Sequence, residues 1–482
     1  MACIVDLFAR RMGYRSVSGI FGFDAGAKIL IIGLGRSGLA SVEVLAEHNV
    51  ALYATDEKPV AELAEPIAAA QSFGARFLEP AELAGVAGEL AFAVLSPGVP
   101  PTSPVVRAMH EANVPVLGEI ELAYRLCNSP ILAVTGTKGK STTTSLIGHL
   151  LRSCGRSVRV GGNIGNPLIK EIRGAGPDDW IVAEVSSFQL ETIRSFKPRV
   201  AVLLNLLPDH LDRYHSMEEY AEAKYRIFAN QSMMDWFVGN LDDPKIRALH
   251  WRGGGTRVQA RQLWFTLDRR EQATLYVRDH TITYAPIAGD PRPVPLVSLD
   301  AIPLPGEHNV RNVMAALLAA LAVGCTPSEL REAVGTFQPM AHRLKTIAEI
   351  EGVRYVDDSK ATNPASVIAA LETYDGPIVL IAGGRAKGTE FAAMGSAIRE
   401  RAAALVAIGE TASEIRRAAA GVDAVEATSM EEAVRRAREF ARPGGVVLLS
   451  PGCASFDMFD SAEDRGERFA AAVESLKEPA GA

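Results

Sequence analysis

The residue types best suited to chemistry gather in a glycine- and lysine-rich stretch, AVTGTKGKSTTTSLIGHLL, at residues 133–151. An apolar run precedes the glycines, and a helical pattern follows them. In such a loop the backbone N–H groups can hold phosphate oxygens, Lys140 can reach the terminal phosphates, and the hydroxyl of Ser141 or Thr142 can bind Mg²⁺. The stretch therefore predicts a nucleoside triphosphate site.

The spacing of this loop differs from the common phosphate-loop pattern. GxxxxGK[ST] would place a glycine at Val134, whereas the chain has the shorter form TGTKGKST at residues 135–142. A solvent-exposed turn is the alternative interpretation, which the strand before the loop and the helix after it disfavour. The candidate nucleotide-binding residues here are Gly136, Thr137, Lys138, Gly139, Lys140, Ser141 and Thr142.

A second glycine-rich loop lies near the start of the chain, in KILIIGLGRSGLA at residues 28–40. Gly33, Gly35 and Gly38 follow an apolar strand pattern and open a helix, and Asp56 ends the next strand pattern. This arrangement is typical of a dinucleotide-binding fold, in which the glycines approach a pyrophosphate and the acid binds a ribose hydroxyl. On this loop alone, a nicotinamide-dependent dehydrogenase is one interpretation.

Two further polar residues follow apolar strand patterns. Glu184 ends WIVAE, and His210 comes shortly after VAVLLNL. In a parallel sheet Glu184 would face the phosphate loop, where its carboxylate suits Mg²⁺, which prefers oxygen ligands. Its alternative role is to cap the next helix through Ser186 or Ser187, and both roles are compatible. His210 by itself is equally well explained by a structural hydrogen bond, because imidazole is a poor ligand for magnesium.

These residues need elements that place them at one edge of a sheet. Short apolar runs that end in Gly, Ser or Asp alternate with helical patterns along most of the chain, which predicts parallel α/β units. Ligands of open parallel sheets bind beyond the carboxyl ends of the strands, where each polar cluster above falls. Between about residues 251 and 305 the pattern changes, and TLYVRDHTITY predicts a hairpin among antiparallel strands.

Composition limits the partners and the location. The chain has 482 residues, 22% of them charged, and a formal net charge of −7, which gives no general attraction to nucleic acid or to acidic membranes. Five scattered cysteines without a CxxC pair argue against a disulfide framework or a zinc site and predict a cytoplasmic protein. The longest apolar segment, VMAALLAALAVGC, is too short for a membrane span, which needs about 20 residues.

A series of motifs resembles the Mur ligases, the ATP-dependent amide-forming enzymes of peptidoglycan synthesis. After TGTKGKST come, in the order of that family, GGNIG, EVSSFQLE, NLLPDHLDRY, YAEAK, NLDDP, GEHNVRN, HR, DDSKATNP, GGRAKG and SPGCASFDMF. The resemblance implies a three-domain α/β fold, with a Rossmann-like domain at 27–120, a central P-loop ATPase-like domain with a mainly parallel sheet at 121–339, and a Rossmann-like domain at 340–482. Residues 1–26 would form a poorly ordered extension.

Within the family, EVSSFQLE, DHLDRY, DSKATN and SPxCASFD together are most similar to the members that add D-glutamate to UDP-N-acetylmuramoyl-L-alanine. The resemblance implies an acyl-phosphate intermediate, and a first domain that holds the uridine diphosphate of this acceptor rather than a nicotinamide. The acceptor-binding residues that it implies are Gly33, Leu34, Gly35, Arg36, Ser37, Gly38, Asp56, Glu57, Ser96, Gly98 and Asn163. SPGVPPTSP, which holds Ser96 and Gly98, is equally well explained as a proline-stiffened turn.

The resemblance also implies two Mg²⁺ ions and their ligands. Ser141 and Glu184 would hold one ion, and His210 the second. Lys224, in the helical pattern AEAKYRIF, would ordinarily be a solvated lysine. In the family pattern it becomes carbamylated to N6-carboxylysine and supplies oxygen ligands to the metals. Lys360 would help to stabilise the reacting phosphate.

Further ATP contacts are implied at the end of the central domain and at the start of the third domain. Asn309 and Asn312 could read adenine, although first-turn capping of a helix explains them equally well. Arg343 and Asp358 would meet ATP when the domains close, with residues 338–343 as the hinge.

The amino acid would bind to the third domain, through Thr362, Lys387, Ser455 and the backbone near Phe456. One position departs from the family pattern, since Ala462 stands where an aromatic residue is usual, which puts the enclosure of the glutamate pocket in doubt.

Two alternatives accompany this interpretation. A sister ligase would add L-glutamate or another amino acid to the same acceptor. A nucleotide-binding protein without turnover is a second alternative, but such a protein would be expected to lack some of Lys140, Glu184, His210 and Lys224, all of which are present. We expect small-molecule substrates only, no nucleic-acid partner, and a monomer.

Overall fold

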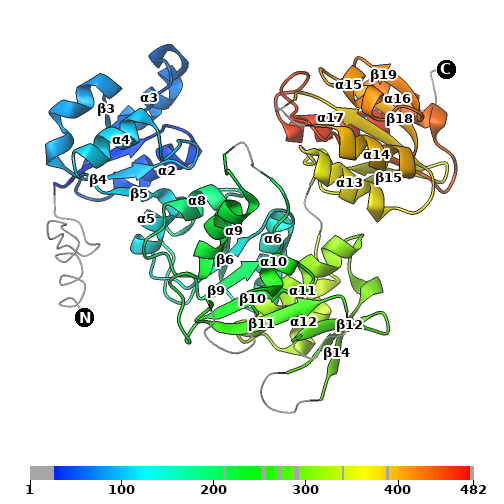
Figure 1. Ribbon diagram of the computed structural model, residues 1–482, viewed down its shortest axis with the longest axis horizontal. Coiled ribbons are helices and arrows are strands. Elements are labelled where there is room, and N and C mark those ends of the chain that lie inside the picture. Colours follow the sequence, from blue (N-terminus) through cyan, green and yellow to red (C-terminus); the bar gives the residue numbers. More distant parts are fainter. Residues whose placement is uncertain are drawn as a thin grey trace. The chain divides into compact units, whose positions relative to one another are not determined.

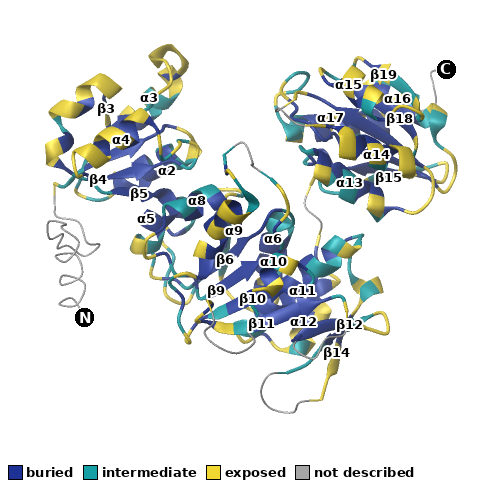
Figure 2. Cartoon of the chain, in the orientation of Figure 1, coloured by how far each residue is buried: buried dark blue, intermediate teal, exposed yellow. Residues whose placement is uncertain are grey.

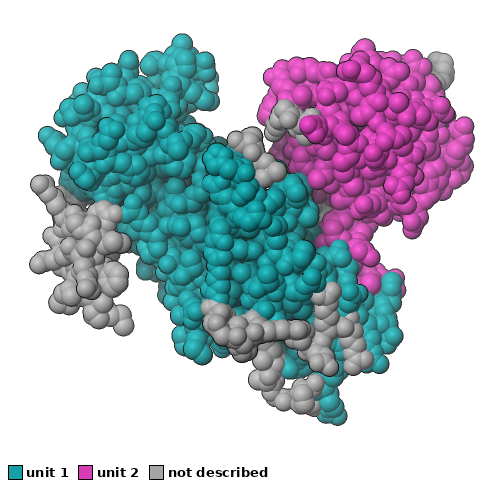
Figure 3. Space-filling view, viewed as in Figure 1, with its two compact units in different colours: residues 1–298, 311–333 teal, residues 299–310, 334–482 magenta. Residues whose placement is uncertain are grey.

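The computed structural model describes residues 26–209, 213–250, 257–268, 273–286, 292–338, 341–386 and 390–477. His210, Lys387 and the extension up to residue 25 therefore lie outside the described residues. The strands of the described part form sheets of five, nine and six strands. The chain divides into two compact units, one of residues up to 298 with 311–333, the other of residues 299–310 with 334–482 (Figure 3).

The first sheet is entirely parallel, as the sequence predicts, and its strand order is β3-β2-β1-β4-β5. Its strands are β1 (Lys28–Ile32), β2 (Ala51–Thr55), β3 (Arg76–Phe77), β4 (Leu90–Leu95) and β5 (Val116–Gly118). The helices of this segment are α2 (Arg36–Leu45), α3 (Ala64–Ser72), α4 (Pro104–Glu111) and α5 (Glu119–Leu126) (Figure 1). The first glycine-rich loop joins the central strand β1 to α2.

The central sheet has the order β14-β13-β12-β11-β10-β9-β6-β8-β7 and is parallel from β7 to β12. The parallel strands are β6 (Ile131–Thr135), β7 (Val158–Gly162), β8 (Trp180–Glu184), β9 (Val200–Leu203), β10 (Trp236–Asn240), β11 (Arg261–Thr266) and β12 (Leu275–Arg278). The accompanying helices are α6 (Lys140–Ser153), α7 (Leu168–Glu171), α8 (Ser187–Glu191), α9 (Met217–Tyr225), α10 (Pro244–Arg247), α11 (Glu307–Ala322) and α12 (Pro327–Val334).

The predicted hairpin is present, but the predicted antiparallel region starts later than expected. β12 pairs antiparallel with β13 (Thr281–Tyr284), which pairs antiparallel with β14 (Val294–Ser298). Asp279 and His280 between β12 and β13 both have positive φ, of 48° and 57°, as a tight type I′ turn requires. The expectation was wrong for β11, which continues the parallel sheet beside β10 because its RQLWFT run is buried like the strands before it.

The third sheet belongs to the C-terminal unit and has the order β15-β16-β20-β17-β18-β19. Its strands are β15 (Lys345–Ile350), β16 (Val353–Asp357), β17 (Ile378–Gly383), β18 (Ala402–Ile408), β19 (Asp423–Ala427) and β20 (Val446–Leu449), all parallel except β15. The helices are α13 (Pro364–Thr373), α14 (Ala392–Arg401), α15 (Ala412–Ala418), α16 (Met430–Phe440) and α17 (Ala462–Ser475).

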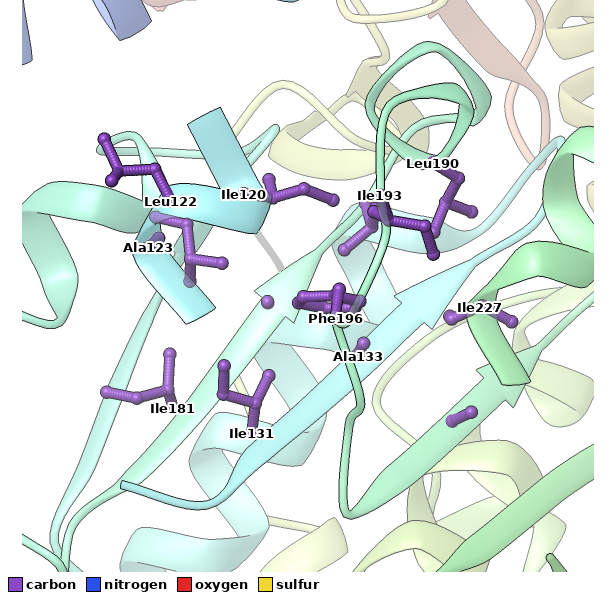
Figure 4. Packing of buried hydrophobic residues seen from close by; sticks show 14 of the residues in the cluster. Ile120, Leu122, Ala123, Ile131, Ala133, Ile181, Leu190, Ile193, Phe196 and Ile227 are labelled. Carbon is purple, nitrogen blue, oxygen red and sulfur yellow. The ribbon is translucent and has the colours of Figure 1, made fainter. Parts of the chain in front are cut away.

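Most strand residues of the three sheets are buried (Figure 2), and most of the buried ones are apolar. One core cluster runs from the first sheet into the central sheet by way of α5. Figure 4 shows members of this cluster from both segments, among them Leu122 and Ala123 of α5 and Ile131 of β6, together with Phe196. Among the described residues, none of the helices combines the length and apolar character that crossing a membrane would require.

The first residue of α5 is a carboxylate buried between elements of the first unit. Glu119 is 1% exposed, and its Oε1 accepts a hydrogen bond from the backbone N–H of Ile169 in α7 at 2.8 Å. Burial is the main cause that raises the pKa of Glu119 from 4.5 to about 7. The folded protein thus keeps a proton that the unfolded chain releases between these two pH values.

This raised pKa predicts that the contribution of Glu119 to the free energy of unfolding falls as the pH rises from about 4.5 to about 7. Above that range the contribution is constant. Glu119→Gln keeps the acceptor for Ile169 and removes the titration. We expect the variant to exceed the wild-type unfolding free energy by up to ~3 kcal/mol above pH 7 and to match it near pH 4.5. Unfolding in urea at several pH values measures the difference, and a pH-independent gap would contradict it.

Candidate active site

The candidate site is built where neighbouring strands of the central sheet end. β6 lies between β8 and β9, and the register pairs Val134 with Glu184 and Thr135 with Leu203. The phosphate loop after β6 therefore begins beside the last residue of β8 and beside the segment that follows β9. This is the edge of a parallel sheet at which ligands bind.

Two glycines allow the phosphate loop its shape. Gly139 precedes the first residue of α6 with φ of +80°, and a Cβ built there would lie 2.2 Å from Oδ1 of Asn312 in α11. Gly136 has φ of +153°, and its Cβ would lie 2.9 Å from Cβ of Leu204. The first turn of α6 contains no acidic residue of its own, and the positive end of the helix dipole faces the loop. The arrangement suits an anionic phosphate chain.

Replacing Gly139 with alanine should damage this loop. The left-handed backbone alone costs about 1–2 kcal/mol for an L-residue, and the new Cβ would also displace Asn312. We expect ATP affinity to fall by at least ~10-fold, measured by calorimetric titration. The matched control is Gly155→Ala at the other end of α6, where φ is +72° and no atom lies within 4 Å, so that only backbone strain is added. Equal affinities in the two variants would contradict the expectation.

Two lysine side chains converge on one carbonyl oxygen of the loop. Nζ of Lys140 donates to the carbonyl of Gly136 at 3.0 Å and to that of Thr137 at 2.9 Å. Nζ of Lys224, in α9, donates to the same Gly136 carbonyl at 2.9 Å and lies 4.7 Å from the ring centre of Tyr220. Lysines from two helices thus meet at the start of the phosphate loop.

Lys224 is buried, contrary to what its helical sequence pattern alone suggests. It is 2% exposed, and burial is the main cause that holds the pKa of its amine well below 10.5, with the nearby Lys140 charge as the next cause. Asp209 and Glu184 act in the opposite direction. A lysine with a lowered pKa is in the neutral, nucleophilic amine form for a larger fraction of the time than an exposed lysine.

Glu184 at the end of β8 has one carboxylate oxygen that accepts a hydrogen bond and one, here called the uncommitted oxygen, that accepts none within the described residues. Oε1 accepts from Nδ2 of Asn163 at 2.7 Å, and the Asn163 N–H donates to the Glu184 carbonyl at 2.9 Å. Oε2 is buried and makes no hydrogen bond within the described residues. The capping alternative does not apply, because α8 is capped by the side chain of Ser186, which accepts from Gln189 N–H. A buried, unsatisfied carboxylate oxygen beside a phosphate loop fits a Mg²⁺ ligand.

The described residues contain no group of three or more His, Cys, Asp or Glu side chains that could hold a metal ion by themselves. Glu184 and the hydroxyls of Ser141 and Thr142 would therefore need other oxygen donors to complete a Mg²⁺ shell. Nucleotide phosphates are donors of the required oxygen type. His210 lies outside the described residues.

The first glycine-rich loop is held by contacts with residues that follow the neighbouring strands β2 and β4. Leu34 N–H donates to Oδ2 of Asp56 at 2.7 Å, and Oε1 of Glu57 accepts from Val105 N–H at the start of α4 at 3.0 Å. A Cβ at Gly33 would lie 2.9 Å from Cβ of Ser96, which brings SPGVPPTSP against the loop. The structure thus gathers Gly33, Asp56, Glu57 and Ser96 at one sheet edge.

The start of α11 carries the two predicted asparagines. Nδ2 of Asn309 donates to the Pro305 carbonyl at 2.7 Å, which agrees with its role in the first helical turn. Asn312 is buried, and its side chain packs against Gly139, as described above.

In the C-terminal unit, Asp358 follows β16 and is buried, and its Oδ2 accepts from the Ser450 hydroxyl at 2.9 Å. Burial raises the pKa of Asp358 from 3.8 to about 7, while the charge of Arg343 acts to lower it. The charges of Arg343 and Asp358 are therefore close enough to interact. Lys360 forms an ion pair with Glu463.

Sequence reasoning missed Arg465, a fully buried residue of α17. Its guanidinium donates to the Ser359 carbonyl at 2.8 Å, to the Ser359 hydroxyl at 3.0 Å and to the Cys453 carbonyl at 3.2 Å. Burial lowers its pKa to about 10. Arg465 thus joins DDSKATNP to SPGCASFDMF, although nothing in its helical surroundings in the sequence indicates burial.

The predicted amino-acid site is only partly described. Ser455 is buried, Thr362 is half-buried, and Phe456 is 61% exposed. At the position that departs from the family pattern, the carbonyl of Ala462 accepts from the Ser359 hydroxyl at 2.7 Å. This residue therefore contributes a backbone contact to Ser359.

Three family descriptions match consecutive segments of the chain. The Mur ligase MurD-like N-terminal domain matches residues 27–118, the Mur ligase middle domain 134–320, and the Mur ligase, glutamate ligase domain 342–453. The chain belongs to the Mur ligase family.

Curated relatives match almost end to end. The chain is 45% identical over 458 residues to the UDP-N-acetylmuramoylalanine–D-glutamate ligase of Pelotomaculum thermopropionicum, which covers 93% of this chain and 98% of the relative. It is 41% identical over 454 residues to the ligase of the same name from Geobacter metallireducens, with 94% and 98% covered.

Solved structures share the fold at lower identity. UDP-N-acetylmuramate-alanine ligase MurC from Thermotoga maritima has a TM-score of 0.56 and 19% identity, and covers 93% of this chain and 100% of its own. MurF ligase from Thermotoga maritima in complex with ADP has a TM-score of 0.56 and 18% identity, with 80% and 96% covered.

Proposed function

We propose that this Mur ligase joins D-glutamate to UDP-N-acetylmuramoyl-L-alanine in peptidoglycan precursor synthesis, with ATP converted to ADP and phosphate. The supporting relatives carry this activity in their names and match nearly the full chain. The observation that carries the proposal is the convergence of Lys140, Lys224 and the uncommitted oxygen of Glu184 around one phosphate loop. An amide ligase needs such a site, because a carboxylate must be activated before an amine can attack it.

In the proposed reaction, the acceptor carboxylate takes the terminal phosphoryl group of ATP, and the amine of glutamate then displaces phosphate from the acyl phosphate. Lys140 would exchange its two loop carbonyls for phosphate oxygens, while the backbone N–H groups at the start of α6 hold the phosphate chain. Bound Mg²⁺ would neutralise phosphate charge, with Glu184 and Ser141 among its ligands and His210 as the ligand of a second ion.

Lys224 is proposed to act as N6-carboxylysine. Its neutral amine would add to CO₂, forming an N–C bond and releasing one proton, to give a carbamate anion. Burial beside Gly136 favours this step because it holds the pKa of the amine well below the usual range. The modified side chain would then offer oxygen ligands for metal in place of a cation.

Roles are proposed for the other predicted residues on the same basis. The first glycine-rich loop with Asp56, Glu57, Ser96, Gly98 and Asn163 would bind the acceptor nucleotide, and Thr362, Lys387, Ser455 and Phe456 the glutamate. Asn309, Asn312, Arg343 and Asp358 would contact ATP, and Lys360 the reacting phosphate. We place the domains at 27–120, 121–339 and 340–482, and a monomeric state stays a prediction.

The test is incubation of the purified protein with UDP-N-acetylmuramoyl-L-alanine, Mg²⁺ and ATP, with D-glutamate, L-glutamate or another amino acid in separate reactions. We expect phosphate release and a product mass increased by one glutamyl residue with D-glutamate only. Product with L-glutamate alone would indicate the sister specificity. Absence of product with every amino acid, together with intact ATP binding, would favour a binding protein without turnover.

A further inference from the structure

The segment that follows β9 is bonded directly to the phosphate loop. Oδ1 of Asn205 accepts from Thr137 N–H at 3.1 Å and from Lys138 N–H at 2.8 Å, and its Nδ2 donates to the Lys138 carbonyl at 3.0 Å. The Asn205 carbonyl also accepts from Thr137 N–H at 3.0 Å. The half-buried side chain of Asn205 therefore bonds both the backbone N–H and the backbone carbonyl of Lys138, as a neighbouring strand would.

A buried hydroxyl continues this connection. Oγ1 of Thr137 accepts from Leu207 N–H at 3.0 Å and lies 3.2 Å from the Leu207 carbonyl and 3.2 Å from the Tyr220 hydroxyl. Thr137 and Tyr220 are 4% and 1% exposed. If Thr137 donates to Leu207 and Tyr220 donates to Thr137, every hydrogen-bonding position of the Thr137 hydroxyl is used. The phosphate loop and residues 205–207 are thus held as one unit, two residues before Asp209.

These bonds decide which amides can reach a nucleotide. The N–H groups of Thr137 and Lys138 donate to Asn205, so a phosphate held by this loop would meet the amides from Gly139 onward, the residue directly before α6. A small shift of the loop would misplace Lys140 and the start of α6 together, and a misplacement of about 1 Å can cost ~100-fold in rate.

We propose that Asn205 is a positioning residue for phosphoryl transfer, which fixes the phosphate loop against the segment after β9 so that the amides from Gly139 onward and Lys140 meet the nucleotide. The proposal rests on the proposed ligase function. Asn205 itself contacts no substrate and acts through the loop.

The test compares Asn205→Ala with a matched control, Asn240→Ala. Asn240 ends the adjacent strand β10 and is buried. Its Nδ2 donates to the Leu204 carbonyl and its Oδ1 accepts from Asp242 N–H, and within the described part of the chain its side chain makes no hydrogen bond to the phosphate loop. Both variants lose an asparagine whose side chain hydrogen-bonds backbone groups at the end of a strand, and both should therefore have a lower Tm than the wild type. A third variant, Asn205→Asp, keeps the acceptor oxygen and loses the donor to Lys138.

We expect Asn205→Ala to lower kcat by at least ~10-fold and to raise the KM for ATP, while Asn240→Ala, corrected for folded fraction, keeps wild-type values. Asn205→Asp should fall between Asn205→Ala and wild type, and it carries the test if Asn205→Ala does not fold. Equal kinetic losses in the Asn205 and Asn240 variants would overturn the proposal, because a merely structural role predicts that result.

Equilibrium binding of ATP separates this proposal from the ligase function. If the wild-type protein binds ATP but forms no product, the ligase function fails while the positioning role can still be measured. Weaker ATP binding in Asn205→Ala than in Asn240→Ala would then support the role of Asn205, and equal binding would overturn it.

Discussion

Replacing Lys224 with methionine should abolish ligase turnover without lowering stability. Turnover should fall at least ~1000-fold, because the variant cannot form a carbamate and loses a proposed metal ligand. Removing a buried amine should stabilise the fold by about 1–3 kcal/mol in CO₂-free buffer. The Gly136 carbonyl keeps a partner, since Lys140 donates to it at 3.0 Å. Initial rates and thermal unfolding measure the two effects.

The pH dependence of this stability difference has a defined sign. The pKa of Lys224 is well below 10.5 in the folded protein, so the unfolded chain binds the proton more readily. Wild-type stability therefore falls, relative to the variant, as pH drops below 10.5 toward the folded pKa. The gap in unfolding free energy should be wider at pH 7 than at pH 10.

Two further variants make the Lys224 result specific. Lys224→Arg keeps a cation but cannot be carbamylated, and wild-type activity in that variant would rule out N6-carboxylysine. Lys245→Met removes a lysine that is paired with Glu218 on the surface and should leave both rate and unfolding temperature nearly unchanged.

Glu184→Gln should reduce kcat/KM by about 100- to 1000-fold. The amide oxygen of glutamine can still accept from Asn163, but the uncommitted Oε2 is replaced by a neutral donor that cannot bind Mg²⁺. The Mg²⁺ concentration for half-maximal rate should therefore rise, while the fold is kept. A Mg²⁺ titration of initial rates gives both quantities.

The matched control for this variant is Glu171→Gln. Oε1 of Glu171 in α7 also accepts from an asparagine, Nδ2 of Asn166 at 2.8 Å, but the pair lies outside the proposed metal site. Its Mg²⁺ dependence should equal that of the wild type. An unchanged Mg²⁺ requirement in Glu184→Gln would show that the carboxylate is not a metal ligand.

Local sequence patterns predicted the parts of the site that depend on local structure. The phosphate loop could be placed because a buried strand, a glycine turn and a helix follow one another along the chain. Glu184 could be placed beside it because parallel strands end at one edge, and the register of β6 and β8 accounts for their proximity. Both inferences follow from residues that are neighbours in the sequence and from the parallel arrangement of the strands.

Features that depend on tertiary packing could not be predicted from local pattern. The burial of Lys224 and Arg465 follows from what covers α9 and α17, and a charged residue in a helix is exposed in most proteins. Asn205 opens the motif NLLPDHLDRY, but no local pattern indicates its bonds, because they go to a loop far away in sequence. β11 was assigned wrongly because a change in composition was taken for a change in strand direction.

The contact between Gly139 and Asn312 has a consequence for biosynthesis. The loop emerges from the ribosome long before residue 312 is translated, although its glycine packs against that distant side chain. Chains fold from the N-terminus as they are made. A nascent polypeptide therefore lacks this packing contact of the phosphate loop until α11 has been synthesised, and the loop reaches its final surroundings only late in translation.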